Sequence, residues 1–260
     1  MKYGFIGCGN MGGALAMALA KATKDICICD HRRSEELAQL LGCISGTDRE
    51  AASCDRVFIG VKPNKVCQAL APVQDILAER KPVLISMAAG LELSTVEKYA
   101  RSSLPIIRIM PNTPVAVGKG MIGYTCNSLV KKEILDDFLG DMADAGVWDA
   151  VEEALMDTVA ALSGSGPAYT YYFAEALCRG AVKCGMKEDQ ALRYAIATLE
   201  GAAEMMKQGD HTPEQLRIAV CSPGGSTLAG LKTLDDAGFP EAVSDCIQAA
   251  HDRNKELSRM

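Results

Sequence analysis

The sequence has no Cys-x-x-Cys pair, no long apolar run and only three histidines, and each absence excludes a class of protein. A helix that crosses a bilayer needs about 18 or more consecutive apolar residues, so we expect no membrane partner. His31, His211 and His251 lie far apart in the chain, which indicates no metal site. The formal net charge of −6 argues against nucleic acid as a partner.

Cysteine is plentiful, but its spacing suggests no pairing. The chain has 11 cysteines, an odd number, and the closest two are Cys27 and Cys29. Scattered cysteines of this kind are typical of free thiols in a reducing compartment rather than of disulfides or zinc ligands. The apolar stretch after Lys2 is interrupted by glycine and asparagine, unlike the continuous core of a secretory signal. We therefore expect a cytoplasmic protein.

The first residues have the pattern of a dinucleotide-binding turn. A short apolar strand leads into Gly7-x-Gly9-x-x-Gly12, and residues 14–22 carry Ala, Leu and Met at helical density. In this motif the first glycine makes a tight turn, the second lets a pyrophosphate approach the backbone, and the third lets helix and strand pack closely. A chain of 260 residues, 48% of them hydrophobic, is long enough for one large or two modest domains.

The first half alternates strand and helix patterns, which predicts a parallel, doubly wound α/β sheet. The second half loses its strand signals near residue 154 and becomes helical. We therefore predict a dinucleotide-binding domain at 1–152 and an all-α domain at 153–260. Strands are expected at 26–30, 56–62, 82–86 and 106–110, with edge strands at 121–125 and 147–150, and helices at 34–41 with Ser34 as N-cap, 63–78 and 129–143.

Several signals in the second half concern helix ends. Thr212 followed by Pro213 and, three residues after the cap, Gln215 is a sharp helix start, and Gly185 and Gly209 suit helix ends. The glycines and Pro167 of Leu162-Ser-Gly-Ser-Gly-Pro-Ala-Tyr169 should bend or break a helix. Such a break serves either close helix packing or a ligand, and the sequence leaves both readings open.

Four loops carry the residues that suggest binding. Three follow predicted strands, where α/β sheets bind ligands: Val61-Lys62-Pro63, Met87-Ala-Ala-Gly90 and Met110-Pro-Asn-Thr-Pro114. The fourth, Ser222-Pro-Gly-Gly-Ser-Thr227, opens an apolar helical stretch. A glycine turn at a helix start presents N–H groups to an anion, so this run predicts a carboxylate cradle. Each loop taken alone is also compatible with a plain turn.

Together with Gly7-x-Gly9-x-Met11-Gly12 and residues 162–169, these motifs stand in the order found in one family, and the chain resembles the pyrroline-5-carboxylate reductase family. The resemblance implies NAD(P)H-dependent reduction of 1-pyrroline-5-carboxylate to L-proline, the last step of proline biosynthesis. It also implies that the helical domain intertwines with a second subunit. A domain rich in Ala, Leu and Met helices is hard to bury alone, so we expect a homodimer or a ring of dimers.

The resemblance also implies site residues. Thr227 is the expected catalytic residue, its hydroxyl polarising the imine. Glu153 corresponds to an acidic position near the substrate in some relatives, although a solvated helix residue is the simpler interpretation. The expected substrate contacts are Val220, Ser222, Gly224, Gly225, Ser226 and Glu153. The expected cofactor contacts are Gly7, Cys8, Gly9, Asn10, Met11, Gly12, His31, Arg32, Arg33, Val61, Lys62, Pro63, Met87, Ala88, Ala89 and Asn112.

Cofactor choice depends on Asp30, which ends the second predicted strand. An acidic residue there usually binds the ribose hydroxyls of NAD, but His31, Arg32 and Arg33 follow it and suit a 2′-phosphate. We expect NADPH, with NADH as an alternative. Related imine or hydroxy-acid reductases and a non-catalytic regulator remain alternatives. The absence of lysine in residues 168–180 argues against the hydroxy-acid branch.

Overall fold

The computed structural model describes residues 1–258, and its internal contacts divide the chain into two compact units. Of the described residues, the first unit comprises Met1–Ser165 together with residues 250–258, and the second is Gly166–Ala249. The domain boundary expected at 152–153 stays a prediction. In residues 1–258, no helix combines the length and apolar character that a membrane span requires.

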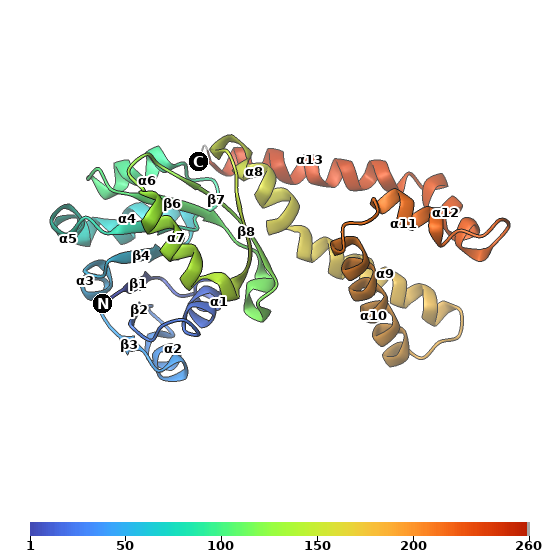
Figure 1. Ribbon diagram of the computed structural model, residues 1–260, viewed down its shortest axis with the longest axis horizontal. Helices are drawn as coiled ribbons and strands as arrows, with labels where there is room; N and C mark the ends of the chain where they lie inside the picture. The colour runs from blue at the N-terminus through green and yellow to red at the C-terminus, as the bar shows by residue number, and fades with distance from the viewer. Residues whose placement is uncertain (259–260) are drawn as a thin grey trace. The chain divides into compact units, whose positions relative to one another are not determined.

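The first unit is built on one eight-stranded sheet with the order β3-β2-β1-β4-β5-β6-β7-β8 (Figure 1). Strands β1 to β6 are parallel, so the predicted doubly wound fold is confirmed. The order reverses between β1 and β4, which makes the carboxyl ends of these two strands the expected ligand site. The strands are β1 (Tyr3–Ile6), β2 (Ile26–Cys29), β3 (Ile44–Ser45), β4 (Arg56–Ile59), β5 (Val83–Ser86), β6 (Ile106–Met110), β7 (Gly120–Cys126) and β8 (Gly146–Ala150).

The sheet departs from the prediction at one strand. Strand β7 was expected at an edge of a parallel sheet, but it is antiparallel to β6 and lies between β6 and β8. The connection from β6 to β7 spans only residues 111–119. A parallel crossover needs about a dozen residues or more, so this connection permits only an antiparallel return.

Two helical layers cover the sheet, each over its own apolar core (Figure 1). Buried residues of α1, α2 and α7 form one core, and those of α3, α4, α5 and α6 form the other. The helices of this unit are α1 (Asn10–Leu19), α2 (Ser34–Leu41), α3 (Asp48–Ala52), α4 (Val66–Leu70), α5 (Gln74–Arg80), α6 (Leu93–Ala100), α7 (Lys132–Asp141) and α8 (Met156–Val159).

Two helix predictions are wrong in detail. The single helix expected at 63–78 is two short α-helices with 3₁₀ turns at Pro63–Lys65 and Ala71–Val73, because Pro72 cannot continue a helical hydrogen-bond ladder. Ser34 is the first helical residue of α2 rather than its N-cap, which is Arg33. The Ser34 hydroxyl instead donates to the carbonyl of Ile28 at 2.5 Å.

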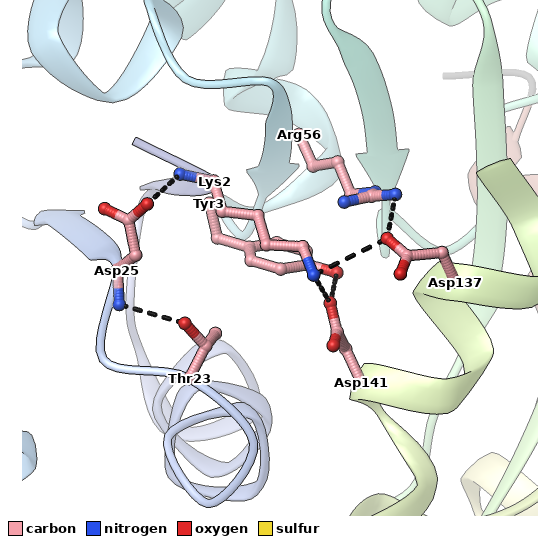
Figure 2. A network of polar contacts seen from close by, with 7 residues as sticks. All are labelled: Lys2, Tyr3, Thr23, Asp25, Arg56, Asp137 and Asp141. Carbon is pink, nitrogen blue, oxygen red and sulfur yellow. Dashed lines mark hydrogen bonds and ion pairs between the residues drawn. The ribbon is translucent and has the colours of Figure 1, made fainter.

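A polar network fastens the amino ends of β1 and β4 to α7 (Figure 2). The Tyr3 hydroxyl and the Lys2 ammonium both contact the Asp141 carboxylate at 2.6 Å, and Arg56 pairs with Asp137 at 2.6 Å. The hydrogen bond to Asp141 raises the pKa of Lys2 above its ordinary value. This network lies at the end of the sheet opposite the carboxyl ends of the strands.

The second unit is entirely helical, as predicted. It is preceded by a π-helical turn at Ala160–Gly164, which confirms that the Ser-Gly-Ser-Gly run interrupts a helix. Thr212 forms the predicted capping box with Gln215, and Gly185 and Gly209 adopt positive φ angles at helix ends. The helices that begin in this unit are α9 (Gly166–Lys183), α10 (Glu188–Lys207), α11 (Pro213–Ala219), α12 (Ser226–Asp236) and α13 (Phe239–Ser258), whose residues from Ala250 belong to the first unit.

Candidate active site

A cavity of about 570 Å³ opens at the switch point between β1 and β4. Five residues predicted to contact a cofactor line this cavity: Gly7, Gly9, His31, Val61 and Lys62. The lining residues outside the list of expected contacts come from the carboxyl ends of β1, β2 and β4, from α3 and from the segment after Lys62. They are Ile6, Cys29, Asp30, Asp48, Gly60, Lys65, Gln68, Ala69 and Pro72.

The three glycines of the fingerprint differ in the space around them. Gly7 has a φ of +87°, and a Cβ there would lie 2.6 Å from Cγ1 of Val61. A Cβ on Gly12 would lie 2.9 Å from the Gly7 carbonyl oxygen, so the third glycine permits close packing. At Gly9 nothing lies within 4 Å of such a Cβ. This open space beside the uncapped start of α1 fits a pyrophosphate.

Asp30 lines the cavity, but its carboxylate is occupied by the backbone. One oxygen accepts from the N–H of Cys8 at 2.8 Å, and the other accepts from Arg32 at 2.9 Å and Arg33 at 3.1 Å. Burial alone would raise the pKa of Asp30, but these hydrogen bonds outweigh burial and hold the pKa below its ordinary value. Asp30 is therefore ionised at neutral pH and braces the glycine loop.

A second carboxylate, Asp48, lies in the same cavity and accepts a hydrogen bond from the Cys29 thiol at 3.0 Å. Burial and this contact raise the pKa of Cys29 to about 12, so the thiol stays protonated. Asp48 was missed in the sequence analysis. Asp48 follows Thr47, the N-cap of α3, and an acidic residue in the first turn of a helix is common and suggests no binding role.

Both polar atoms of the Asn112 side-chain amide form hydrogen bonds with backbone groups. Its Nδ2 donates to the carbonyl of Ser163 at 3.0 Å, and its Oδ1 accepts from the N–H of Met121 at 3.0 Å. Its cofactor contact stays a prediction, and so do those of all the other residues expected to contact the cofactor, including the five that line the cavity.

The Glu153 carboxylate also forms its contacts within the first unit. Its Oε1 accepts from the N–H of Leu93 at 2.7 Å and from Nη1 of Arg108 at 3.1 Å. Arg108 is almost fully buried, with a side chain 3% exposed. Neither sequence interpretation of Glu153 anticipated this pair, because Arg108 lies 45 residues away in the chain, on strand β6.

The Ser222–Thr227 run has the backbone of an anion cradle. The Gly225 N–H donates to the Ser222 carbonyl at 3.0 Å, and Gly224 has a φ of +70°, which is the geometry of a type II turn with Pro223 and Gly224 at its centre. Helix α12 then begins at Ser226, and its N-cap Gly225 provides no side-chain cap. The first N–H groups of α12 are thus available to an anion. Val220, at the end of α11, is 67% exposed.

This fold, with an open glycine cradle at the switch point and a helical region after it, defines a two-domain NAD(P)-dependent oxidoreductase. Residues 2–90 match the family described as NADP oxidoreductase, coenzyme F420-dependent, and residues 153–257 match the pyrroline-5-carboxylate reductase dimerisation family. A pyrroline-5-carboxylate reductase of Corynebacterium melassecola is 35% identical over 98% of this chain and 97% of its own length. One of Aquifex aeolicus is 33% identical over 99% and 97%.

Solved structures agree with these sequence relatives. A Plasmodium falciparum pyrroline carboxylate reductase with NADP bound superposes with a TM-score of 0.90 at 30% identity, covering 99% of this chain and 98% of that one. A pyrroline-5-carboxylate reductase from Coxiella burnetii gives a TM-score of 0.90 at 33% identity, with coverages of 100% and 99%. The chain belongs to the pyrroline-5-carboxylate reductase family, as its motifs predicted.

Proposed function

We propose that this protein reduces 1-pyrroline-5-carboxylate to L-proline, with NADPH as its main reductant and NADH as an alternative. The observation that carries the proposal is that one chain holds both an open glycine cradle for a pyrophosphate and a second N–H cradle, at Ser222–Thr227, for a carboxylate. Family membership over nearly the whole chain supports the same reaction.

The first unit has residues that fit the dinucleotide. Gly9 and the start of α1 would hold the pyrophosphate. Because both oxygens of Asp30 already accept backbone N–H groups, Asp30 is poorly placed to select NAD. His31, Arg32 and Arg33 would then receive the 2′-phosphate of NADPH, a charge-assisted contact. The bound cofactor supplies the hydride that reduces the C=N bond.

The second cradle fits the substrate, a small cyclic imine with one carboxylate. The N–H groups around Gly224–Thr227 would hold the carboxylate, with Val220, Ser222 and Ser226 beside them. The Thr227 hydroxyl would lie beside the ring nitrogen, where it can donate a hydrogen bond to the neutral imine and accept one from the N–H of the protonated imine. A protonated imine is already electrophilic: its carbon gains the hydride and its nitrogen keeps the proton as the secondary amine. Orientation therefore supplies much of the acceleration.

We further propose a homodimer or a ring of dimers in a reducing compartment such as the cytoplasm. The match to a dimerisation family and the many exposed apolar side chains of the second unit, among them Tyr172, Tyr194 and Ile218, support the assembly. All eleven cysteines are free thiols, which supports the compartment.

The test is the oxidation of NADPH by purified protein with 1-pyrroline-5-carboxylate, set beside NADH. We expect turnover that depends on the imine and is faster with NADPH at low cofactor concentration. Oxidation of NADPH by a 2-keto acid instead, with formation of the 2-hydroxy acid, would favour the hydroxy-acid reductase alternative. Absence of any turnover, with NADPH bound, would favour a regulator.

A further inference from the structure

Glu153 joins three separate segments of the first unit through one carboxylate oxygen. It accepts a hydrogen bond of 2.7 Å from Leu93 at the start of α6 and pairs at 3.1 Å with Arg108 in the middle of β6. The Glu153 side chain is only 35% exposed and that of Arg108 is 3% exposed. Glu153 itself stands just after β8, at the start of the 3₁₀ turn Glu153–Leu155.

The partners of Glu153 lead to two loops that hold predicted cofactor contacts. Leu93 follows the Met87–Gly90 loop, in which Gly90 needs a φ of +78°. Strand β6, which carries Arg108, runs directly into the Met110–Pro114 loop and ends two residues before Asn112. Both loops start at the carboxyl ends of adjacent parallel strands, β5 and β6, where ligands bind in such sheets.

The charge on Glu153 is engaged by a buried guanidinium. The Nε of Arg108 has no hydrogen-bond partner within residues 1–258, so the ion pair through Nη1 is what compensates this buried charge there. A carboxylate that is paired with a buried guanidinium is poorly suited to bind a substrate ammonium or imine. It is well suited to hold two loops at a fixed separation.

We propose that Glu153 is a positioning residue for hydride transfer rather than a substrate contact. By holding the start of α6 against β6, it sets the relative position of the Met87–Gly90 and Met110–Pro114 loops. It does not touch the reacting atoms. A displacement of about 1 Å at a reacting centre can cost about a hundredfold in rate, so a distant brace of this kind affects kcat. The inference rests on the proposed function, because it assumes that these loops face the nicotinamide.

The test uses Glu153→Gln and Glu153→Ala, with Asp137→Asn as the matched control. The amide of Gln keeps an acceptor for Leu93 but loses the charge that faces Arg108, whereas Ala loses both. Asp137 forms the corresponding pair with Arg56, whose side chain is 10% exposed, on β4 of the same sheet. That pair lies at the opposite end of the strands. If Glu153→Ala does not fold, Glu153→Gln decides the question.

Positioning predicts a kcat per folded enzyme about tenfold lower in Glu153→Gln, and up to about a hundredfold lower in Glu153→Ala. The KM for 1-pyrroline-5-carboxylate should stay within about twofold of the wild-type value. The isotope effect on kcat with NADPH deuterated at C4 should be at least as large as in the wild type, because hydride transfer is the step that slows. Asp137→Asn should lose stability but keep its kcat.

Other outcomes would overturn the inference. A raised KM for the imine with unchanged kcat would make Glu153 a substrate contact, and unchanged kcat and KM would make it a stabilising residue only. The fluorescence of bound NADPH gives a readout that needs no turnover: Glu153→Gln should bind NADPH but alter the nicotinamide emission, and unaltered emission would count against positioning. If the wild type binds NADPH but reduces no imine, the proposed function fails while this binding test remains available.

Discussion

Asp30 shows how the cofactor site departs from the simplest interpretation of its sequence. An acidic residue at the end of the second strand usually receives the ribose hydroxyls, yet here its two oxygens accept three backbone N–H groups. The side chain therefore supports the turn that carries His31, Arg32 and Arg33. We therefore expect Arg32 and Arg33 to select between NADPH and NADH.

Replacing Arg32 and Arg33 together by Ala should raise the KM for NADPH much more than the KM for NADH. Each charge-assisted contact contributes about 1.5–3 kcal/mol, so the expected loss for NADPH is at least about tenfold. Steady-state kinetics with both cofactors measures it. The comparison variant is Asp30→Asn, which should weaken both cofactors alike because an amide N–H would face a backbone N–H. Equal effects of the double Ala variant on the two cofactors would leave the arginines as a solvated surface.

Thr227→Ala should lower kcat/KM for 1-pyrroline-5-carboxylate by about one to three orders of magnitude. Loss of one hydrogen bond that forms in the transition state typically costs up to about 10² to 10³. The affinity for NADPH, measured by fluorescence titration, should barely change. Thr227→Ser keeps the hydroxyl and should retain most of the activity. Wild-type kcat/KM in Thr227→Ala would remove this residue from the mechanism.

The sequence predicted the glycine fingerprint and the Ser222–Thr227 turn because each is local: a few adjacent residues specify the backbone by themselves. The partners of Asp30 and Glu153 could not be predicted in this way. Cys8 lies 22 residues before Asp30 in the chain, and Arg108 lies 45 residues before Glu153. Only the register of the folded sheet brings such residues together.

Among the elements, buried parallel strands were the most predictable, since they read as short apolar runs. Strand β6 has the predicted bounds, Ile106–Met110. Short or exposed elements were missed: β3 has two residues, both exposed. Helix α3 has only five residues, too few for a helical period to be visible.

Gly60 marks the closest approach between the ends of β4 and β1. A Cβ there would lie 2.2 Å from the Gly7 carbonyl oxygen, and neither backbone can yield without moving a strand. Gly60→Ala should therefore lower stability by about 1–3 kcal/mol and weaken cofactor binding. Thermal unfolding with and without NADPH measures both effects.

Gly140, in helix α7, is the control for Gly60. A Cβ there meets nothing within 4 Å, and alanine favours a helix over glycine by up to about 1 kcal/mol. Gly140→Ala should leave stability unchanged or raise it. Equal destabilisation by both substitutions would contradict the close approach described for Gly60.

On the scale of the whole molecule, the second unit buries few of its hydrophobic side chains. Within it, only Ala191 and Ala195 are buried hydrophobic residues, whereas the first unit has two large cores on its sheet. An apolar surface of this kind usually marks an interface, and two-fold homodimers are the commonest solution.

Light scattering at micromolar concentration should therefore show a dimer or a multiple of dimers. Replacing Tyr172 and Tyr194, which are 67% and 60% exposed, by charged residues should shift this equilibrium towards monomer and reduce stability. Substituting the exposed Leu40 of the first unit controls for a general effect of surface charge. A monodisperse species near the 27.6 kDa chain mass with full reductase activity would contradict the assembly.

The central claim is hydride transfer from NADPH to the imine carbon of 1-pyrroline-5-carboxylate. It is tested most directly by incubating the protein with this substrate and NADPH doubly deuterated at C4, followed by mass spectrometry and NMR of the product. The account predicts L-proline carrying one deuterium, at the carbon that was part of the C=N bond. Proline without deuterium, or consumption of NADPH without proline, would contradict it.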